Sequence, residues 1–283
     1  MRRLVLVEGV PGSGKSTTAQ FIEAAGRARG LEVRNVGEGD PEHPADLDQV
    51  ALLQDADLRR LDADLPAHAG TVRAAAEPHA GYWLVRDRAR PSWPSDLREW
   101  LARRDVYDGA IDPDLHARAI VESWRRFAGT PTGPDLTVFE AVLLQNPICA
   151  LVARFDRPAS AVAAHVRQLA ETVADLDPLL VYLDPGDPEP VLAAAAAERP
   201  AEWLDFVIRY HTGQGYGAAQ GLDGFAGLVE FMRMRRDLEL GLLPELPLQS
   251  CVVDVSGRDR QAHAREIEAV IDRHLGAGAA PTS

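Results

Sequence analysis

Short apolar runs alternate along the chain with longer segments in which apolar residues recur at helical spacing. The apolar runs, which predict buried strands, are 4–8, 31–36, 136–148, 179–184 and 251–255. Between and after them, helices are predicted over 14–29, from 191 to about 200, over 203–243 around a glycine-rich break, and over 260–275. Strands that alternate with helices form parallel sheets with right-handed crossovers. The pattern therefore predicts an α/β fold, a doubly wound parallel sheet of five strands.

One stretch departs from this alternation. Residues 44–133 have charged helical faces, as in DADLRRLDADL, and contain four of the five tryptophans, among them Trp83. The turn-forming sequence GTPTGPD closes the stretch. We expect a single domain over 1–283 that carries a helical insertion over 44–133 and ends in a frayed tail over 276–283.

Composition limits the classes of protein that fit. The net charge is −13, which argues against a surface that coats nucleic acid. No apolar run approaches the ~20 residues of a membrane span, and Cys149 and Cys251 stand among apolar neighbours, as buried thiols do. We expect a cytoplasmic protein without nucleic-acid or membrane partners, and leave open whether it forms a homodimer.

The strongest local signal is GVPGSGKS, which directly follows the first predicted strand and opens the first helix. It matches the phosphate-binding loop G-x-x-x-x-G-K-[ST], in which glycines turn backbone N–H groups onto phosphate oxygens. Its lysine, Lys15, is the only lysine among 30 basic residues. Lys15 is predicted to contact the β- and γ-phosphates of ATP and Ser16 to hold Mg²⁺. The predicted ATP-binding residues of the loop are Gly9, Gly12, Ser13, Gly14, Lys15, Ser16 and Thr17.

Acidic residues near strand ends supply the remaining candidates for metal binding and proton transfer. Glu140 follows the apolar run Leu-Thr-Val-Phe and is predicted to hold Mg²⁺ with Ser16, whereas Asp135 precedes the strand and belongs to the wrong edge of the sheet. Glu38, Asp40 and Glu42 follow the second strand, so one of them could take a proton from an attacking hydroxyl. Asp40 is preferred because it lies after two flexible glycines.

Arginines supply the remaining candidates for contacts to the transferred phosphate. Arg199, after a predicted helix, and Arg209 lie where a mobile lid would close over it. The basic patch of Arg233, Arg235 and Arg236 could supply another phosphate clamp. Trp83 offers a stacking surface for the molecule that accepts the phosphate. The segment GQGYG follows no strand and is interpreted as a flexible lid connection.

The stretch EGVPGSGKSTTA resembles the P-loop kinases of the nucleoside- and nucleotide-kinase group, including thymidylate-kinase-like enzymes. The order of an acid-ended third strand, LLVYLD with a helix running to an arginine, and VVDVSG near the end is also similar to theirs. The resemblance implies the P-loop NTPase fold, ATP and Mg²⁺ as ligands, Arg199 as the lid arginine, and Arg258 in the loop that borders adenine.

The sequence departs from that group after the third strand. Those kinases usually carry an acid followed by arginine, whereas Glu140 is followed by Ala141 and then by VLLQNP. Gln145 and Asn146 become candidates for contacting the acceptor, together with Glu38 and Trp83. The acceptor that we expect is a small molecule with a hydroxyl group, nucleoside-like or a specialised metabolite or antibiotic.

Two other classes of P-loop protein compete with a kinase. A guanine-specific switch needs Asn-Lys-x-Asp, which this chain lacks because its one lysine lies in the phosphate loop. A P-loop ATPase or an ATP-binding regulatory protein without a small-molecule acceptor stays as the alternative. ADP release that depends on an added acceptor would favour the kinase, and steady ADP release without an acceptor would favour the ATPase.

Overall fold

A computed structural model describes residues 2–86, 90, 92–257 and 259–276. The chain divides into two compact units. The first contains Met1–Glu38 and Pro131–Ser283, and the second contains Gly39–Thr130. The phosphate loop belongs to the first unit.

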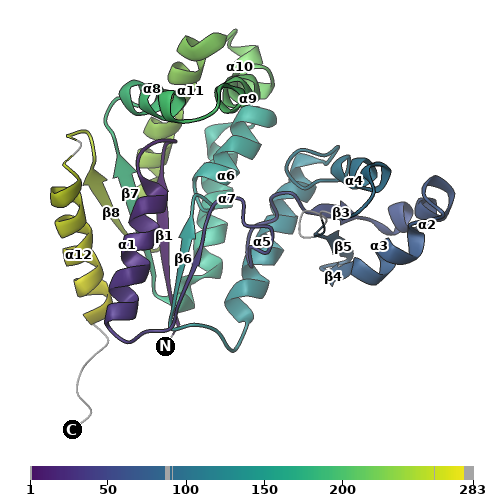
Figure 1. Ribbon diagram of the computed structural model, residues 1–283, viewed down its shortest axis with the longest axis horizontal. Coiled ribbons are helices and arrows are strands. Elements are labelled where there is room, and N and C mark those ends of the chain that lie inside the picture. The colour runs from purple at the N-terminus through teal and green to yellow at the C-terminus, as the bar shows by residue number, and fades with distance from the viewer. Residues whose placement is uncertain (1, 87–89, 91, 258, 277–283) are drawn as a thin grey trace. The chain divides into compact units, whose positions relative to one another are not determined.

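The first unit is built on a parallel sheet of five strands (Figure 1). Its strands, in the order β2-β6-β1-β7-β8, are Val33–Val36, Leu136–Glu140, Arg3–Gly9, Pro178–Asp184 and Gln249–Asp254. All four neighbouring pairs are parallel. This confirms the predicted α/β class and the doubly wound sheet of the P-loop NTPase fold.

Helices cover both faces of this sheet. On one face, Ile22 of α1 and Ile267 and Ile271 of α12 pack against Val5 and Val181. On the other face, the Tyr182 side chain of β7 meets α11. The helices of this unit are α1 (Lys15–Ala28), α6 (Gln145–Ile148), α7 (Ala159–Thr172), α8 (Glu189–Glu198), α9 (Ala201–Thr212), α10 (Gly215–Ala219), α11 (Gly224–Leu242) and α12 (Arg260–Gly276).

The second unit contains a small sheet that the sequence analysis did not predict. Strands β3 (Ala51–Leu53), β5 (Tyr82–Val85) and β4 (Glu77–His79) pair antiparallel in that order. Four helices accompany them: α2 (Asp55–Asp64), α3 (Ala69–Ala75), α4 (Ser95–Ala102) and α5 (Pro113–Gly129). Strands of three or four residues are too short to show a period in the sequence.

The third predicted strand is shorter than its apolar run. Strand β6 ends at Glu140, and Ala141 then adopts a φ of 66°, a left-handed conformation that turns the chain out of the sheet. The rest of the run, VLLQNPI, contains α6 and leads into a π-helical segment at Cys149–Arg154. A continuous apolar run cannot by itself distinguish a buried strand from a buried helix.

Two other features concern the chain as a whole. Of the tail predicted over 276–283, Gly276 ends α12, and the remainder lies outside the described residues. None of the helices in the described part of the chain is both long and apolar enough to cross a membrane.

Candidate functional site

The phosphate loop connects β1 to α1 through glycines in conformations that other residues rarely adopt. Gly9, Gly12 and Gly14 have φ angles of 142°, 85° and 96°. Gly12 also lies against α8, because a Cβ there would be 2.6 Å from the Val191 carbonyl oxygen. The loop is therefore shaped both by backbone freedom and by the neighbouring helix.

The lysine of the loop is buried at the carboxyl end of β1. The Lys15 ammonium donates to the carbonyl oxygens of Gly9, at 3.1 Å, and Val10, at 3.3 Å. Only 6% of the residue is exposed. These contacts hold the positive charge at the mouth of the loop, where backbone N–H groups and the start of α1 favour an anion.

Ser16 and Glu140 lie together beside this lysine. The Ser16 hydroxyl donates to Glu140 Oε1 at 2.7 Å, across 124 residues of sequence. Strand β6 brings Glu140 there because it pairs with β1 in a register that sets Glu140 opposite Val7. Asp135 lies at the other end of β6, where its carboxylate accepts from the Glu32 N–H at 2.9 Å. A hydroxyl and a carboxylate are oxygen donors of the kind that Mg²⁺ prefers, so the pair fits the predicted metal.

A cavity of about 350 Å³ adjoins the loop within the first unit. Gly12, Ser13, Gly14 and Thr17 form one wall, and α8, the end of β8 and α12 form the others through Val191, Ala195, Arg199, Val255, His263 and Ile267. The Arg199 guanidinium stacks over the Trp203 ring at 4.3 Å. The structure thus brings Arg199 to the same cavity as the loop, whereas Arg258 lies outside the described residues.

Glu38 is held at the carboxyl end of β2 by Gln145. The Gln145 amide donates from Nε2 to Glu38 Oε1 at 2.6 Å, and its own oxygen accepts from Arg235 at 3.1 Å. The preceding residue, Gly37, lies beside Glu140, since a Cβ there would be 3.8 Å from Glu140 Oε2. Glu38, Gln145 and the Ser16–Glu140 pair therefore form one cluster.

The other predicted acceptor-side residues make separate contacts. In the second unit, the Asp40 carboxylate accepts from the Glu42 N–H at 2.8 Å, and the Trp83 indole donates to Asp55 at 3.3 Å. In the first unit, the Asn146 backbone N–H donates to the Ala141 carbonyl at 3.1 Å. The roles assigned to Asp40, Trp83 and Asn146 stay predictions.

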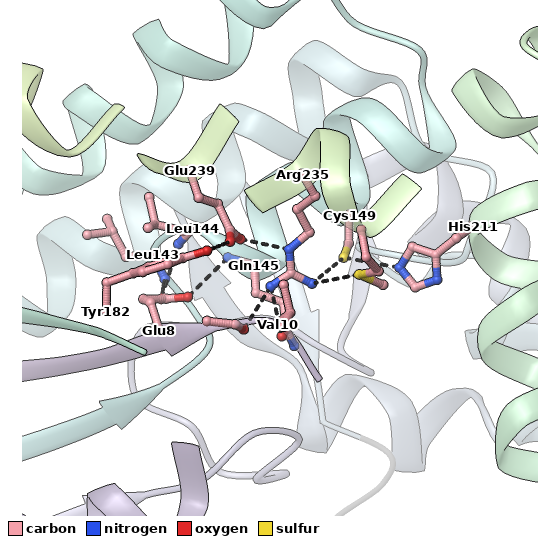
Figure 2. Close-up of polar contacts among 12 residues, drawn as sticks. Glu8, Val10, Leu143, Leu144, Gln145, Cys149, Tyr182, His211, Arg235 and Glu239 are labelled. Carbon is pink, nitrogen blue, oxygen red and sulfur yellow. Dashed lines mark hydrogen bonds and ion pairs between the residues drawn. The ribbon is translucent and has the colours of Figure 1, made fainter. Parts of the chain in front are cut away.

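Behind the loop lies a buried network that the sequence analysis missed (Figure 2). Glu8 of β1 accepts from the N–H groups of Leu143, Leu144 and Gln145, at 2.7, 3.1 and 3.2 Å. Burial, reinforced by the nearby Glu239 charge, raises the pKa of Glu8 to about 7. The sequence did contain one signal of this network, because Glu8 is an acidic residue in the apolar first strand, directly before the phosphate loop.

The same network contains a thiol that is held neutral. The Cys149 Sγ lies 3.6 Å from His211 Nε2, and His211 Nδ1 is 2.7 Å from the Val207 carbonyl oxygen. Burial raises the pKa of Cys149 to about 11 and lowers that of His211 to about 4. This pair therefore supplies neither a thiolate nor an imidazolium.

The basic patch of the sequence anchors α11 through ion pairs. Arg233 pairs with Asp187 and Glu189 at 2.9 Å, and Arg236 binds both oxygens of Asp184 at 2.6 and 2.7 Å. Arg235 pairs with Glu239 at 2.7 Å. The pairs of Arg233 and Arg236 tie α11 to the carboxyl end of β7 and to the segment after it, whereas the Arg235–Glu239 pair lies within α11.

The glycine-rich GQGYG segment is tightly packed, which corrects its interpretation as a flexible lid connection. Its last three residues begin the short helix α10, and a Cβ on Gly217 would lie 2.0 Å from the His211 carbonyl oxygen. A Cβ on Gly215 would lie 2.3 Å from the Ala153 carbonyl oxygen. Glycine is needed here because the backbones of α9, α10 and the π-helical segment approach one another closely.

The parallel sheet, the glycine loop after β1 and the acid at the end of β6 define a protein of the P-loop NTPase fold. No protein-family model matches the chain. Over 152 residues, however, it is 32% identical to the thymidylate kinase of Rhizorhabdus wittichii, a match that spans 50% of this chain and 69% of that protein. The chain therefore belongs to the thymidylate kinase family of P-loop kinases.

Proposed function

We propose that the protein is an ATP-dependent phosphotransferase that moves the γ-phosphoryl group of ATP to a hydroxyl of a small molecule. The observation that carries this proposal is the 2.7 Å contact between Ser16 and Glu140 beside the buried Lys15. A metal-binding hydroxyl, a carboxylate and a phosphate-binding lysine are the parts that phosphoryl transfer requires. Membership of a kinase family supports the same activity.

ATP would lie with its triphosphate on the loop and its base in the adjoining cavity. Lys15 would contact the β- and γ-phosphates, and backbone N–H groups of residues 12–17 would bind the remaining oxygens. Arg199, at the rim of the cavity, would cover the nucleotide. Ser16 and Glu140 would hold Mg²⁺, which supplies charge neutralisation when bound. The catalytic contribution of this chain is then mainly positioning and electrostatics.

Glu38 supports a hydroxyl rather than a phosphate as the acceptor group. Its carboxylate accepts from the Gln145 amide, and the preceding residue, Gly37, lies beside Glu140. There Glu38 could take the proton of an attacking alcohol. A phosphate acceptor is already an anion, so it needs no base and would be repelled by that carboxylate. We therefore propose Glu38 as the base, with Asp40 as the rival residue from the sequence.

The experiment is a panel of acceptors read by ADP formation from MgATP. Thymidine, thymidine 5′-monophosphate and an aminoglycoside represent a nucleoside, a nucleotide and an antibiotic, and thymidine 5′-monophosphate is included because of the relative's name. ADP that appears only with a hydroxyl acceptor supports the proposal. Steady ADP release without any acceptor would favour an ATPase, and activity with the monophosphate alone would show that the acceptor group is a phosphate.

Two variants then identify the base. Glu38→Gln should lower kcat at least about tenfold and leave the KM for ATP nearly unchanged, because the loop contacts remain. Asp40→Asn is the matched control. A larger loss of kcat in Asp40→Asn would transfer the role of base to Asp40.

A further inference from the structure

A buried arginine connects the phosphate loop to the acceptor side of the site. We infer that Arg235 is a positioning residue, which orients the Gln145 amide so that its NH₂ group holds the Glu38 carboxylate in place. The role in catalysis rests on the proposed function. The orientation itself is a property of the protein alone.

The contacts of Arg235 join α11 to the start of the phosphate loop and to α6 (Figure 2). Its Nη2 donates to the Gly9 carbonyl at 3.0 Å and to Gln145 Oε1 at 3.1 Å, and its Nε donates to Glu239 at 2.7 Å. The side chain is 1% exposed. Gly9 begins the phosphate loop and also accepts from Lys15, so Lys15 and Arg235 meet on one carbonyl.

The hydrogen-bonding capacity of the groups fixes the direction of the amide. A guanidinium has donors only, so the atom of Gln145 that faces Arg235 must be the oxygen. The NH₂ group then faces Glu38, whose carboxylate accepts from it at 2.6 Å. Chains of hydrogen bonds in a low-dielectric interior strengthen one another, so the arginine polarises the amide toward Glu38.

The positive charge of Arg235 is balanced by the carboxylate of Glu239. Glu239, which is fully buried, accepts from Arg235 through one oxygen and from the Tyr182 hydroxyl, at 2.7 Å, through the other. Arg235 and Glu239 both belong to α11, so their ion pair connects that helix to no other element. The contacts of Arg235 that leave α11 are those to Gly9 and Gln145. The planar guanidinium of Arg235 donates to Gly9, Gln145 and Glu239 at once. A lysine ammonium is a single point charge and does not present donors in this fixed planar arrangement.

The first test measures the amide directly and needs no acceptor. In protein labelled with ¹⁵N, the Gln145 side-chain amide is assigned from its loss in Gln145→Leu, and its proton exchange with solvent is recorded. Arg235→Met should speed this exchange at least about tenfold, because the amide loses the donor that fixes it. Glu38→Gln should also change the exchange rate of the Gln145 amide protons, because it removes the carboxylate to which they donate. Arg233→Met, on the same helix but in an exposed ion pair, should not.

Removing one member of a buried ion pair endangers folding, so a second variant keeps the test decisive. Arg235→Met with Glu239→Gln removes both charges and avoids an unpaired buried carboxylate. Unchanged exchange of the Gln145 amide in a folded variant that lacks Arg235 would overturn the inference. If neither variant folds, Arg235 is a structural residue and the inference is wrong.

The second test separates positioning from ATP binding. With an acceptor found in the panel, Arg235→Met should lower kcat about tenfold or more and change the KM for ATP less than about threefold, since Lys15 and Ser16 are intact. Equal losses in both constants would refute the positioning role. A wild-type protein that is inactive with every acceptor would count against the proposed function, and the amide measurement would still decide the orientation.

Discussion

Two glycines of the phosphate loop, Gly12 and Gly14, allow backbone strain to be measured separately from steric overlap with α8. Alanine at Gly12 must adopt a φ of 85°, and its Cβ would lie 2.6 Å from the Val191 carbonyl oxygen and 3.2 Å from the Ala195 Cβ. Gly14 is the matched control, because its φ is 96° but a Cβ there has no neighbour within 4 Å. Gly14→Ala therefore carries the backbone strain alone, about 1–2 kcal/mol.

Gly12→Ala adds the displacement of α8. Overpacking against a backbone carbonyl costs a further ~1–3 kcal/mol, since the Val191 carbonyl is part of α8 and cannot rotate away. In a unit of this size each kcal/mol corresponds to roughly 2–4 °C in Tm. We expect Gly14→Ala to lower Tm by roughly 2–8 °C and Gly12→Ala to lower it by several degrees more.

The assay is thermal unfolding without nucleotide, followed by titration with a fluorescent ATP analogue. Without nucleotide, the two variants differ only in the overlap with α8. Gly12→Ala should also weaken ATP binding, because Val191 and Ala195 line the cavity beside the loop. Equal Tm values for the two variants would refute the proposed contact between the loop and α8.

Three further outcomes follow from the site. Lys15→Ala should abolish acceptor-dependent ADP formation while the circular dichroism spectrum is unchanged, and full activity would refute the proposed site. The raised pKa of Glu8 means that its contribution to stability is complete below pH 4.5 and is lost as the pH rises to about 7. In the wild type, this loss lowers the unfolding free energy by about 3 kcal/mol between these pH values. Glu8→Gln should remove that decline, and denaturant titrations that give the same dependence of unfolding free energy on pH in both proteins would contradict this. Because burial raises the pKa of Cys149 and of Cys251 to about 11, iodoacetamide at pH 8 should modify both slowly, and rapid labelling seen by mass spectrometry would contradict it.

The features that the sequence predicted correctly are those that local patterns encode. Five apolar runs separated by helical segments were sufficient for the parallel sheet, and the placement of Glu140 beside Ser16 followed from the rule that parallel strands end at one edge. The end of β6 was not predictable from periodicity, because apolar residues continue beyond it from Ala141 to Leu144. Only the turn at Ala141 shows where the strand stops.

The buried network was beyond the reach of local patterns. Arg235 meets Gly9 across 226 residues, and nothing near either residue in the sequence specifies the other. In the sequence, Arg235 looked like its exposed neighbour Arg233, since both lie in one basic patch. Helix packing decides which of them is buried.

The strand order has a consequence for how the protein forms during synthesis. Strand β1 is the first to leave the ribosome, yet its neighbours in the sheet are β6 and β7, which begin at residues 136 and 178. At ~5–20 residues per second, the apolar β1 of the nascent chain waits several seconds or more for its first partner. Arg235, which donates to the carbonyl of Gly9 at the start of the loop, is synthesised later still. The phosphate loop, although it follows the earliest of these strands to be synthesised, is therefore among the last parts of the first unit to reach its native environment.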